Sequence, residues 1–332
     1  MAHVQLQHEE PQHIEPQYPN TSTMKSIKAI APATVANVSC GFDIFGFAVE
    51  SPADEVIVTL SEKPGVVIKE ITGDDGLLPL ESSRNTSSVA IQAFLNKIGS
   101  NQGAEIVLHK KLPLGSGMGS SAASSVAALI AINHLHDNPC TREQLLPFAM
   151  EAERIACGSA HADNVAPSLL GGFVLIRSYA PLDVTKIPTP AGLYCTLVHP
   201  HMELKTEDSR RVLKSSIPMK DAITQWGNIA GLVVGLMKPD YGLITRSLQD
   251  VIAEPIRSVL IPGFDAIKEI AIEHGALGSG ISGSGPTIFS LSIGADTANK
   301  VGNAIQEQFK IMKLKSDVFV SRINQVGARI AE

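Results

Sequence analysis

The segment Leu112-Pro113-Leu114-Gly115-Ser116-Gly117-Met118-Gly119-Ser120-Ser121-Ala122-Ala123-Ser124 has a glycine at every second position and then a run of small residues that opens an apolar stretch. Glycine lets the backbone adopt positive φ and approach a ligand closely. The first N–H groups of a helix lack intrahelical partners and lie at the positive end of its dipole. A glycine-rich loop that opens a helix can therefore bind phosphate without a lysine.

Other structures could use the same residues. Serine is a common N-cap, so Ser120 or Ser121 alone indicates only a helix start, and the glycines could serve a tight turn. In dinucleotide-binding folds such a loop follows the first strand of a βαβ unit, and an acidic residue lies about 20 positions further on. Asp137 stands 18 residues after Gly119, but at a predicted helix end. A Walker P-loop is excluded because no lysine follows the glycines.

Strand-like and helical patterns alternate on both sides of this loop. Runs rich in Val and Ile predict strands at 26–31, 55–60, 66–70, 105–110 and 173–179. Helical periodicity predicts helices at 87–99, 120–136 and 141–156. The helix at 120–136 is apolar on nearly all sides, so we expect it to be buried at the centre of the protein.

A proline-rich stretch at 181–192 is the expected domain boundary. Beyond it the pattern predicts strands near 193–199, 287–293 and 317–323, and helices near 221–237, 242–253, 263–274 and 296–310. We therefore expect an α+β protein in three parts. These are a disordered leader at 1–24, an N-terminal domain at 25–185 and a C-terminal domain at 186–332.

The composition is typical of a soluble globular protein, with 332 residues of which 44% are hydrophobic and 18% charged. A net charge of −6 offers no broad basic surface, which argues against nucleic acid as a partner. No run approaches the roughly 18 apolar residues of a membrane span. The four cysteines form no C-x-x-C pair, so neither a zinc site nor a disulfide framework is indicated, and we expect a cytoplasmic protein. They are Cys40, Cys140, Cys157 and Cys195.

Three segments together resemble the motifs of the GHMP kinases, a family of ATP-dependent small-molecule kinases. The loop at 112–124 is similar to the central motif, APATVANVSCGFDIFG at 31–46 resembles the N-terminal motif, and GALGSGISGSGPTIFSL at 275–291 resembles the C-terminal glycine-rich motif. The resemblance extends from Lys25 to the C-terminus. It implies a two-domain GHMP kinase fold, with an N-terminal domain like domain 2 of ribosomal protein S5, a ferredoxin-like C-terminal domain and an active site between them.

The resemblance also implies nucleotide-binding residues, with ATP as co-substrate. They are Pro113 to Ala122 of the loop, together with residues of the C-terminal motif, namely Gly280, Ser282, Gly283, Ser284 and Gly285. Asn85 matches a further nucleotide position in the family. Because Asn is also a common N-cap, Asn85 could instead only begin the helix that follows it.

Phosphoryl transfer needs Mg²⁺ and an aligned acceptor hydroxyl. Family members place a magnesium-binding glutamate in the helix that corresponds to the one expected here at 141–156, which matches Glu153 with Ser121 as its partner. Without the family, Glu153 would be taken as a solvated helix residue. Asn164 lies 11 residues further on, where mevalonate kinase has an aspartate proposed as general base. Asp163 could take that role with a one-residue shift. We expect catalysis mainly by positioning and electrostatics, with Asn164 near the metal and the acceptor oxygen.

Six positions match substrate residues of the family members that phosphorylate L-homoserine: Asn37, Asp43, His161, Thr206, Arg210 and Arg257. Homoserine is a zwitterion, so its carboxylate suits the two arginines and its ammonium group suits Asp43 and Asn37. Arg210 is preferred to Arg211 because of its four-residue spacing from Thr206. Each residue alone has an ordinary alternative, such as an Asx turn at Asp43, a loop cap at His161 or a surface arginine.

The resemblance therefore implies ATP- and Mg²⁺-dependent phosphorylation of the L-homoserine hydroxyl in threonine biosynthesis. Two alternatives stay open from the sequence. The acceptor could be another small alcohol such as mevalonate or a sugar, or the chain could be a binding protein that has the fold without the catalysis. Many members of the family form dimers, so the resemblance also implies a homodimer.

Overall fold

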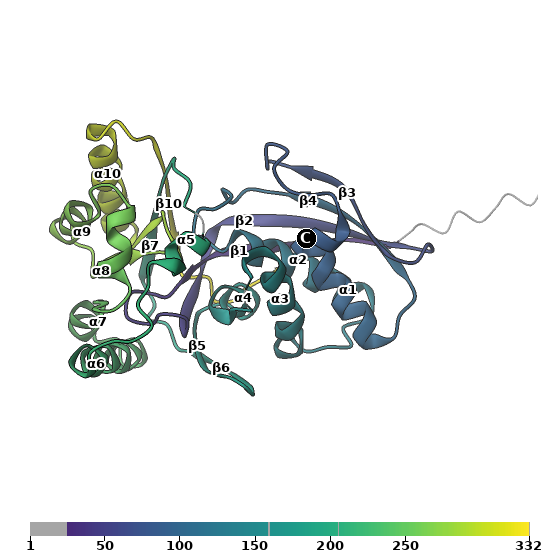
Figure 1. Cartoon of the computed structure of the whole chain (residues 1–332), viewed down its shortest axis with the longest axis horizontal. Coiled ribbons are helices and arrows are strands. Elements are labelled where there is room, and N and C mark those ends of the chain that lie inside the picture. The colour runs from purple at the N-terminus through teal and green to yellow at the C-terminus, as the bar shows by residue number, and fades with distance from the viewer. Residues whose placement is uncertain (1–24, 159, 205, 332) are drawn as a thin grey trace, which may run out of the picture.

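The structure, a computed structural model, describes residues 25–158, 160–204 and 206–331. Residues 1–24, which the sequence predicts to be a disordered leader, lie outside the described residues. Two sheets with their helices form the two halves of the molecule, and the long strands β1 and β2 run from one half toward the other (Figure 1).

The first sheet has seven strands, and residues from both ends of the described chain contribute to it. Its main order is β11-β1-β2-β4-β3, while β5 pairs with the start of β2 and with β6. Strands β3 and β4 are parallel and the other pairs are antiparallel. The strands are β1 (Ser26–Ala36), β2 (Phe45–Ser61), β3 (Val66–Thr72), β4 (Gly103–His109), β5 (Phe173–Tyr179), β6 (Leu182–Ile187) and β11 (Arg329–Ile330).

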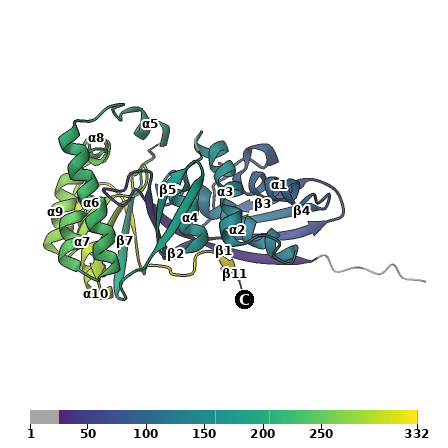
Figure 2. The ribbon, with the colours of Figure 1, turned by 90° about the horizontal axis from the view of Figure 1, so that it is seen from below.

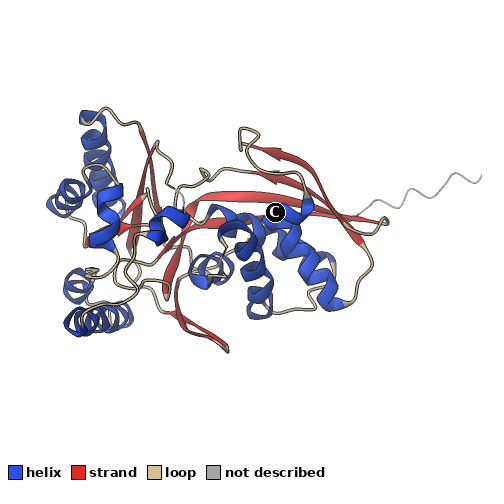
Figure 3. Ribbon diagram, in the orientation of Figure 1, coloured by secondary structure: helices blue, strands red, loops and turns tan. Residues whose placement is uncertain are grey.

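Four helices gather on one side of this sheet (Figure 3): α1 (Thr86–Ile98), α2 (Ser120–Leu135), α3 (Arg142–Cys157) and α4 (Ala162–Leu170). A short 3₁₀ turn, η1 (Ser82–Arg84), precedes α1. Helix α2 lies among them and contacts α1, α3, α4, β1 and β2. Nearly all its residues are buried, as its uniformly apolar sequence predicts. The N-terminus of α2, which follows the glycine-serine loop, is therefore held by packing on every side.

The second half has a four-stranded antiparallel sheet in the order β10-β7-β9-β8. Helices α9 and α10 pack against it, which gives the β-α-β-β-α-β pattern of a ferredoxin-like domain. The elements are β7 (Leu193–Pro200), α5 (Thr206–Arg211), α6 (Met219–Met237), α7 (Tyr241–Ser247), α8 (Glu254–Arg257), η2 (Ser258–Leu260), α9 (Phe264–Glu273), β8 (Gly278–Ile281), β9 (Ile288–Ile293), α10 (Ala295–Ile311) and β10 (Ser316–Arg322). The predicted two-domain fold class is confirmed.

One core joins the two halves. Phe289 of β9 packs edge-on against Phe47 of β2, with ring centroids 6.1 Å apart. Leu193 and Leu291 of the second sheet belong to the same buried cluster as the residues beneath the first sheet. Because apolar burial is the main stabilising contribution to folding, this shared core fixes the two halves relative to each other.

Some elements differ from the sequence prediction. The stretch expected to link the domains contains β6, which forms a hairpin with β5, so residues 185 and 186 lie inside a strand of the first sheet. The chain passes to the second sheet between Ile187 and Leu193. Helix α7 ends at Ser247 rather than 253, because the Asp250 carboxylate accepts hydrogen bonds from the backbone N–H groups of 252–254 and starts α8 instead.

Candidate active site

A cavity of about 550 Å³ lies between the two halves. Residues around the start of α1 line one end of it, including Leu78, Pro79, Arg84 and Asn85. The glycine-serine loop lines the middle. Side chains from both halves line the other end: Asn37, His161, Asp163, Asn164, Arg210 and Arg257. Pro113, Met118 and Ala122 of the loop do not line this cavity, and Met118 and Ala122 are fully buried behind it.

The three loop glycines all have left-handed backbones, with φ of 62° at Gly115, 79° at Gly117 and 67° at Gly119. A Cβ at Gly117 would lie 2.4 Å from the carbonyl oxygen of Ser282, and one at Gly119 would lie 2.1 Å from Thr34 Oγ1. Two things therefore require glycine at these two positions: the left-handed backbone of the loop and the close contacts with other parts of the protein. Helix α2 begins at the next residue, so its first N–H groups lie beside the cavity.

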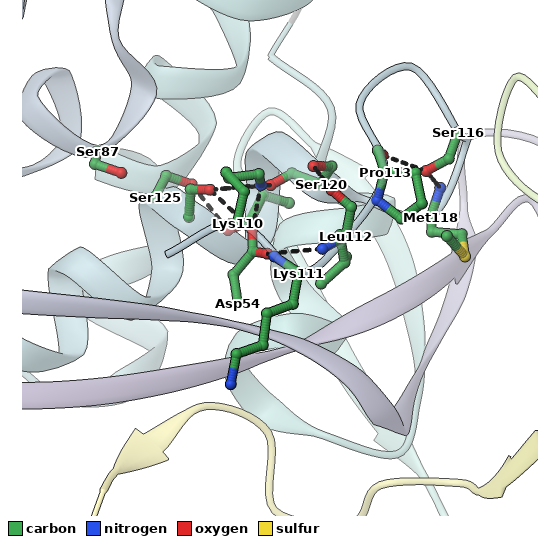
Figure 4. A network of polar contacts seen from close by, with 12 residues as sticks. Asp54, Ser87, Lys110, Lys111, Leu112, Pro113, Ser116, Met118, Ser120 and Ser125 are labelled. Atoms are coloured by element: carbon green, nitrogen blue, oxygen red, sulfur yellow. Dashed lines mark hydrogen bonds and ion pairs between the residues drawn. The ribbon is translucent and has the colours of Figure 1, made fainter. Parts of the chain in front are cut away.

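A buried ion pair fixes the loop from behind (Figure 4). Lys110, directly after β4, donates to the Asp54 carboxylate of β2, to Ser124 Oγ at 2.9 Å and to the Ser120 carbonyl at 2.8 Å. Asp54 Oδ1 also accepts from the backbone N–H groups of Lys111 and Leu112. Both ionised side chains are almost completely buried. This network, called here the loop anchor, joins the start of the loop and the first turn of α2 to the sheet.

Sequence analysis missed the loop anchor, although the strand contains a signal for it. Asp54 lies on the same face of β2 as Val56, Val58 and Leu60, because successive side chains of a strand alternate between its two faces. This face points into the core. A carboxylate in an inward-facing register must find a buried partner. Burial lowers the pKa of Lys110 and the adjacent Asp54 opposes that shift, so Asp54 favours the charged form of Lys110.

The C-terminal glycine-rich segment packs directly on the loop. Ser282 Oγ donates to the Gly117 carbonyl at 2.8 Å, and the N–H of Thr287 donates to the Ser116 carbonyl at 3.2 Å. Gly283 and Ser284 line the cavity, whereas Ser282 and Gly285 are buried beside it. Gly280 lies in β8, where a Cβ would meet Glu254. The two glycine-rich motifs therefore form one layer of backbone at the domain interface.

Glu153 and Ser121 both line the cavity, from α3 and the first turn of α2. The Glu153 residue is 5% exposed. Glu151, two residues earlier, is instead a surface residue paired with Arg154 at 2.6 Å. The alternative of a solvated helix glutamate therefore describes Glu151 and not Glu153.

Asp163 and Asn164 lie in the first turn of α4, at the far end of the cavity. Asp163 is buried, and this burial, reinforced by the Asp43 carboxylate, raises the pKa of Asp163 to about 7. Asn164 Oδ1 accepts a hydrogen bond from Thr34 Oγ1 at 2.7 Å. Because its oxygen is used in this way, the amide can offer N–H donors elsewhere. Thr34, which the sequence analysis did not single out, is thus the residue that orients Asn164.

The charged groups assigned to the substrate pair with each other. Arg210 donates through Nη2 and Nη1 to the two carboxylate oxygens of Asp43, at 2.6 and 3.1 Å. Arg257 is buried, donates to the carbonyls of Ser209 and Gly283, and stacks over the Phe42 ring. Burial and the nearby Arg210 lower the pKa of Arg257 to about 10, which leaves it cationic at neutral pH.

Of the other predicted substrate residues, Asn37 holds the backbone in place. Asn37 has φ of 70°, donates to the Gly283 carbonyl at 2.7 Å and accepts from the N–H of Asp43. His161 lines the cavity 3.9 Å from Asp43, and burial lowers its pKa, which favours the neutral ring. Thr206 begins α5, but its side chain lies outside what the structure describes.

Asn85 has the capping role that the sequence left open. Its Oδ1 accepts from the N–H of Ser87 at 3.0 Å, and its Nδ2 donates to the Pro79 carbonyl at 3.1 Å. It also lines the cavity, so it fixes the edge at which η1 and α1 meet.

The described residues contain no group of three or more His, Cys, Asp or Glu side chains placed to hold a metal ion. A nucleotide-bound Mg²⁺ takes most of its ligands from phosphates and water, so one carboxylate and one hydroxyl suit it. Within the described part of the chain, no helix is long and apolar enough to cross a membrane.

Comparisons with known proteins agree with this geometry. The family model for the N-terminal domain of GHMP kinases matches residues 85–172, and the model for the C-terminal domain matches residues 232–311. A mevalonate kinase structure from L. major superposes with a TM-score of 0.69 at 16% identity, over 91% of this chain and 98% of that one, which shows a shared fold.

Closer relatives match almost end to end. A homoserine kinase of Chlorobium phaeovibrioides is 54% identical over 92% of this chain and 100% of its own length. One of Xylella fastidiosa is 38% identical, with 93% and 95% covered. The crystal structure of homoserine kinase from Cytophaga hutchinsonii superposes with a TM-score of 0.91 at 56% identity, over 95% of this chain and all of that one. The chain belongs to the homoserine kinases of the GHMP kinase family.

Proposed function

We propose that this protein transfers the γ-phosphoryl group of ATP to the side-chain hydroxyl of L-homoserine and releases O-phospho-L-homoserine, a step of threonine biosynthesis. Its family consists of ATP-dependent phosphotransferases that act on an alcohol. The observation that carries the proposal is one continuous cavity with a glycine-rich backbone in its middle and, at one end, the guanidinium group of Arg210, which is paired with the Asp43 carboxylate.

The triphosphate lies along the glycine-serine loop. Left-handed glycines turn the loop around the cavity, and the first N–H groups of α2 supply donors and the positive end of the helix dipole. The nucleoside end extends toward Leu78, Pro79 and Asn85. Because the loop anchor fixes this backbone before ATP arrives, little conformational freedom is lost on binding.

Glu153 and Ser121 fit a Mg²⁺ ion carried by the nucleotide, because a buried carboxylate and a hydroxyl face the same cavity beside the loop. When bound, the ion neutralises charge on the β- and γ-phosphate oxygens. A carboxylate that is largely removed from water attracts a cation more strongly than a solvated one. The site is therefore electrostatically suited to a divalent cation.

Asp163 accepts the proton of the homoserine hydroxyl. The pKa of Asp163, about 7, is close to neutral pH, so a substantial fraction of its carboxyl groups is ionised there. The ionised group also binds a proton more tightly than an ordinary carboxylate does. Asn164 cannot take a proton, but its amide, oriented by Thr34, can donate to the transferred group. Positioning and electrostatics supply the rest of the acceleration.

Homoserine binds by exchange with the Asp43–Arg210 pair. Its carboxylate takes the place of Asp43 beside Arg210, and its ammonium group takes the place of Arg210 beside Asp43. Each partly buried charge keeps an opposite partner in both states, so the exchange avoids leaving an uncompensated ion. Mevalonate, which has a carboxylate but no ammonium group, and an uncharged sugar cannot complete this exchange.

The test offers the purified protein ATP and Mg²⁺ with homoserine, mevalonate, galactose or serine, and measures ADP release. Homoserine should exceed the others by more than about tenfold in kcat/KM, because one unpaired buried polar group costs roughly 1–3 kcal/mol. Preference for mevalonate or galactose would overturn the acceptor, and absence of turnover with every acceptor would favour a binding protein without catalysis.

A further inference from the structure

The ring of Phe42 lies against both arginines that line the cavity. Phe42 is half-buried in the connection between β1 and β2, directly before Asp43. The guanidinium carbon of Arg257 lies 4.9 Å from the centroid of this ring, and that of Arg210 lies 5.5 Å from it. Both distances are within the roughly 6 Å at which an aromatic face attracts a cation. One ring therefore contacts two cations.

The turn that carries Phe42 is held from both ends. The Gly41 carbonyl accepts a hydrogen bond from the N–H of Phe45 at 3.0 Å. On the other side, Tyr179 Oη donates to the Asp43 carbonyl at 2.7 Å. The backbone on each side of the ring is thus tied to the rest of the protein, so the ring has a fixed position beside the cavity.

The two arginines come from neighbouring short helices. Arg210 is on α5 and Arg257 is on α8, which lie side by side in both views of the ribbon (Figures 1 and 2). Arg257 Nε also donates to the Ser209 carbonyl of α5 at 2.9 Å. Burial and, after it, the charge of Arg210 lower the pKa of Arg257, as expected for two cations that repel each other. An aromatic face attracts both cations and so offsets part of this repulsion.

We propose that Phe42 is a positioning residue for recognition of the acceptor's carboxylate, because its ring holds the guanidinium groups of Arg210 and Arg257 together at one end of the cavity. The inference rests on the proposed function, in which the homoserine carboxylate takes the place of Asp43 beside Arg210. During that exchange Arg210 changes its anionic partner, whereas its contact with the ring is kept. The arginines are therefore in place before the acceptor binds, which lowers the entropy lost on binding.

The alternative is that Phe42 only fills space beneath the apolar stems of the arginines. In that case any apolar side chain of similar volume would serve, and its loss would affect all acceptors alike. The proposed role predicts instead an effect that depends on the electrons of the ring and that requires a carboxylate on the acceptor.

The first test is the steady-state kinetics of Phe42→Leu, because leucine keeps most of the apolar volume but has no aromatic face. The homoserine KM should rise roughly 5- to 30-fold, as two cation–π contacts imply, whereas kcat and the ATP KM should change by less than about threefold. Phe42→Tyr keeps the ring and should stay close to the wild type. Phe319→Leu, at a half-buried phenylalanine of β10 in the second sheet, is the matched control. An unchanged homoserine KM in Phe42→Leu, or an equal rise in both KM values, would overturn the inference.

A second acceptor separates carboxylate recognition from general damage to the site. 3-Aminopropan-1-ol is homoserine without its carboxylate, so the two arginines have no anion to bind in it. Phe42→Leu should lower kcat/KM for homoserine roughly 5- to 30-fold and that for 3-aminopropan-1-ol by less than about twofold. An equal loss with both acceptors would mean a structural role alone and would contradict the proposal.

Fluorinated phenylalanines at position 42 test the electrostatic cause. Each added fluorine withdraws electrons from the face of the ring and changes its size little, so the attraction for cations should weaken step by step. With one, two and three fluorines introduced at this single position, the logarithm of the homoserine KM should increase with each fluorine. A constant KM across the series would mean that the ring only fills space.

A measurement on the free protein keeps this inference separate from the proposed function. In protein with isotope-labelled arginine, the ring current of Phe42 should shift the Nε–H resonances of Arg210 and Arg257, and Phe42→Leu should remove that shift. Arg210→Lys and Arg257→Lys assign the two signals. Signals that do not move would refute the stacking whatever the acceptor is. Signals that move in a protein that does not phosphorylate homoserine would support the positioning by Phe42 and overturn the proposed function alone.

Discussion

The two ends of the cavity differ in which groups face it. The phosphate end is the part along the glycine-serine loop, and the acceptor end is the part that Arg210 and Arg257 line. At the phosphate end, loop backbone and helix N–H groups face the cavity, and the charges that hold them, Asp54 and Lys110, have side chains with exposures of 0% and 1%. At the acceptor end, side chains face the cavity, and the paired Asp43 and Arg210 are 24% and 30% exposed. The first end is fixed before any ligand binds, whereas the second can exchange partners.

Under the proposed function, this difference corresponds to what each end recognises. Every ATP molecule presents the same triphosphate, so a fixed backbone surface is sufficient to bind it. Such a surface loses little conformational entropy on binding. The acceptor must be distinguished from other small alcohols, and specificity comes from charges that only a zwitterion can satisfy. We therefore expect substitutions at the phosphate end to affect ATP and protein stability, and substitutions at the acceptor end to affect the choice of acceptor.

Glu153→Gln should have the largest effect, because Glu153 lies between the two ends and neutral glutamine cannot balance a divalent cation. We expect kcat to fall about 10³-fold, with little change in homoserine binding. Steady-state kinetics over a range of Mg²⁺ concentrations measures this, and excess Mg²⁺ should restore only part of the loss. Glu151→Gln, on the exposed side of α3, is the control; near-normal turnover in Glu153→Gln would remove the metal assignment.

Asp163→Asn should lower kcat about 10²- to 10³-fold, the contribution typical of a general base. In the wild type, kcat/KM should rise with pH as Asp163 ionises and level off above about pH 7. If the variant keeps both its rate and that pH dependence, another group takes the proton.

The free energy of unfolding should fall over the same pH range in which kcat/KM rises. The folded-state pKa of Asp163, about 7, lies above the ordinary value of 3.8, so the folded protein binds this proton more tightly than the unfolded chain. The unfolding free energy should therefore fall as pH rises from about 4 to 7, by at most ~4 kcal/mol. Asp163→Asn removes this loss, so thermal melting should show a variant more stable than the wild type at pH 8 but not at pH 4.

Asp54→Asn tests the claim that the phosphate end is held from behind. It leaves the buried Lys110 ammonium without its counter-ion, which should cost about 3–5 kcal/mol of unfolding free energy. Displacement of the loop should reduce kcat/KM for ATP by up to ~10²-fold, with a smaller change in the homoserine KM. The control is Glu55→Gln on the same strand, whose surface ion pairs contribute at most about 1 kcal/mol. Equal effects on the two substrates would mean that the anchor stabilises the whole cavity rather than the loop.

Arg210→Lys should have the smallest effect and should be confined to the acceptor end. Lysine keeps the charge but loses the planar fork that holds both oxygens of a carboxylate. We expect a homoserine KM raised roughly 5- to 20-fold, within the range of one lost polar contact, and an unchanged ATP KM. Arg211→Lys provides the comparison; a larger effect there would show that the neighbouring arginine is the one that faces the substrate.

The sequence by itself determined the parts of this protein that are local. The run at 120–135, which is apolar on nearly all sides, makes a buried helix wherever it lies, because almost no face of it favours water. Glycines at 115, 117 and 119 followed by serines specify a left-handed loop at a helix start, since the conformational freedom of glycine and the unpaired N–H groups of a helix are properties of the chain itself. Strand and helix types were therefore mostly predictable.

Only the tertiary structure decided which distant residues meet. Asp54 and Lys110 are 56 positions apart, and Asp43 and Arg210 are 167 apart. Neither pair is implied by spacing, because each depends on how the sheets place their ends. The same holds for β6 and β11, whose pairing partners in the first sheet make them strands. The burial of Glu153 distinguishes it from the surface residue Glu151, and the shared core brings both ends of the cavity together. Both are decided by the fold, because the surroundings of a side chain depend on the folded structure and not on the order of residues along the chain.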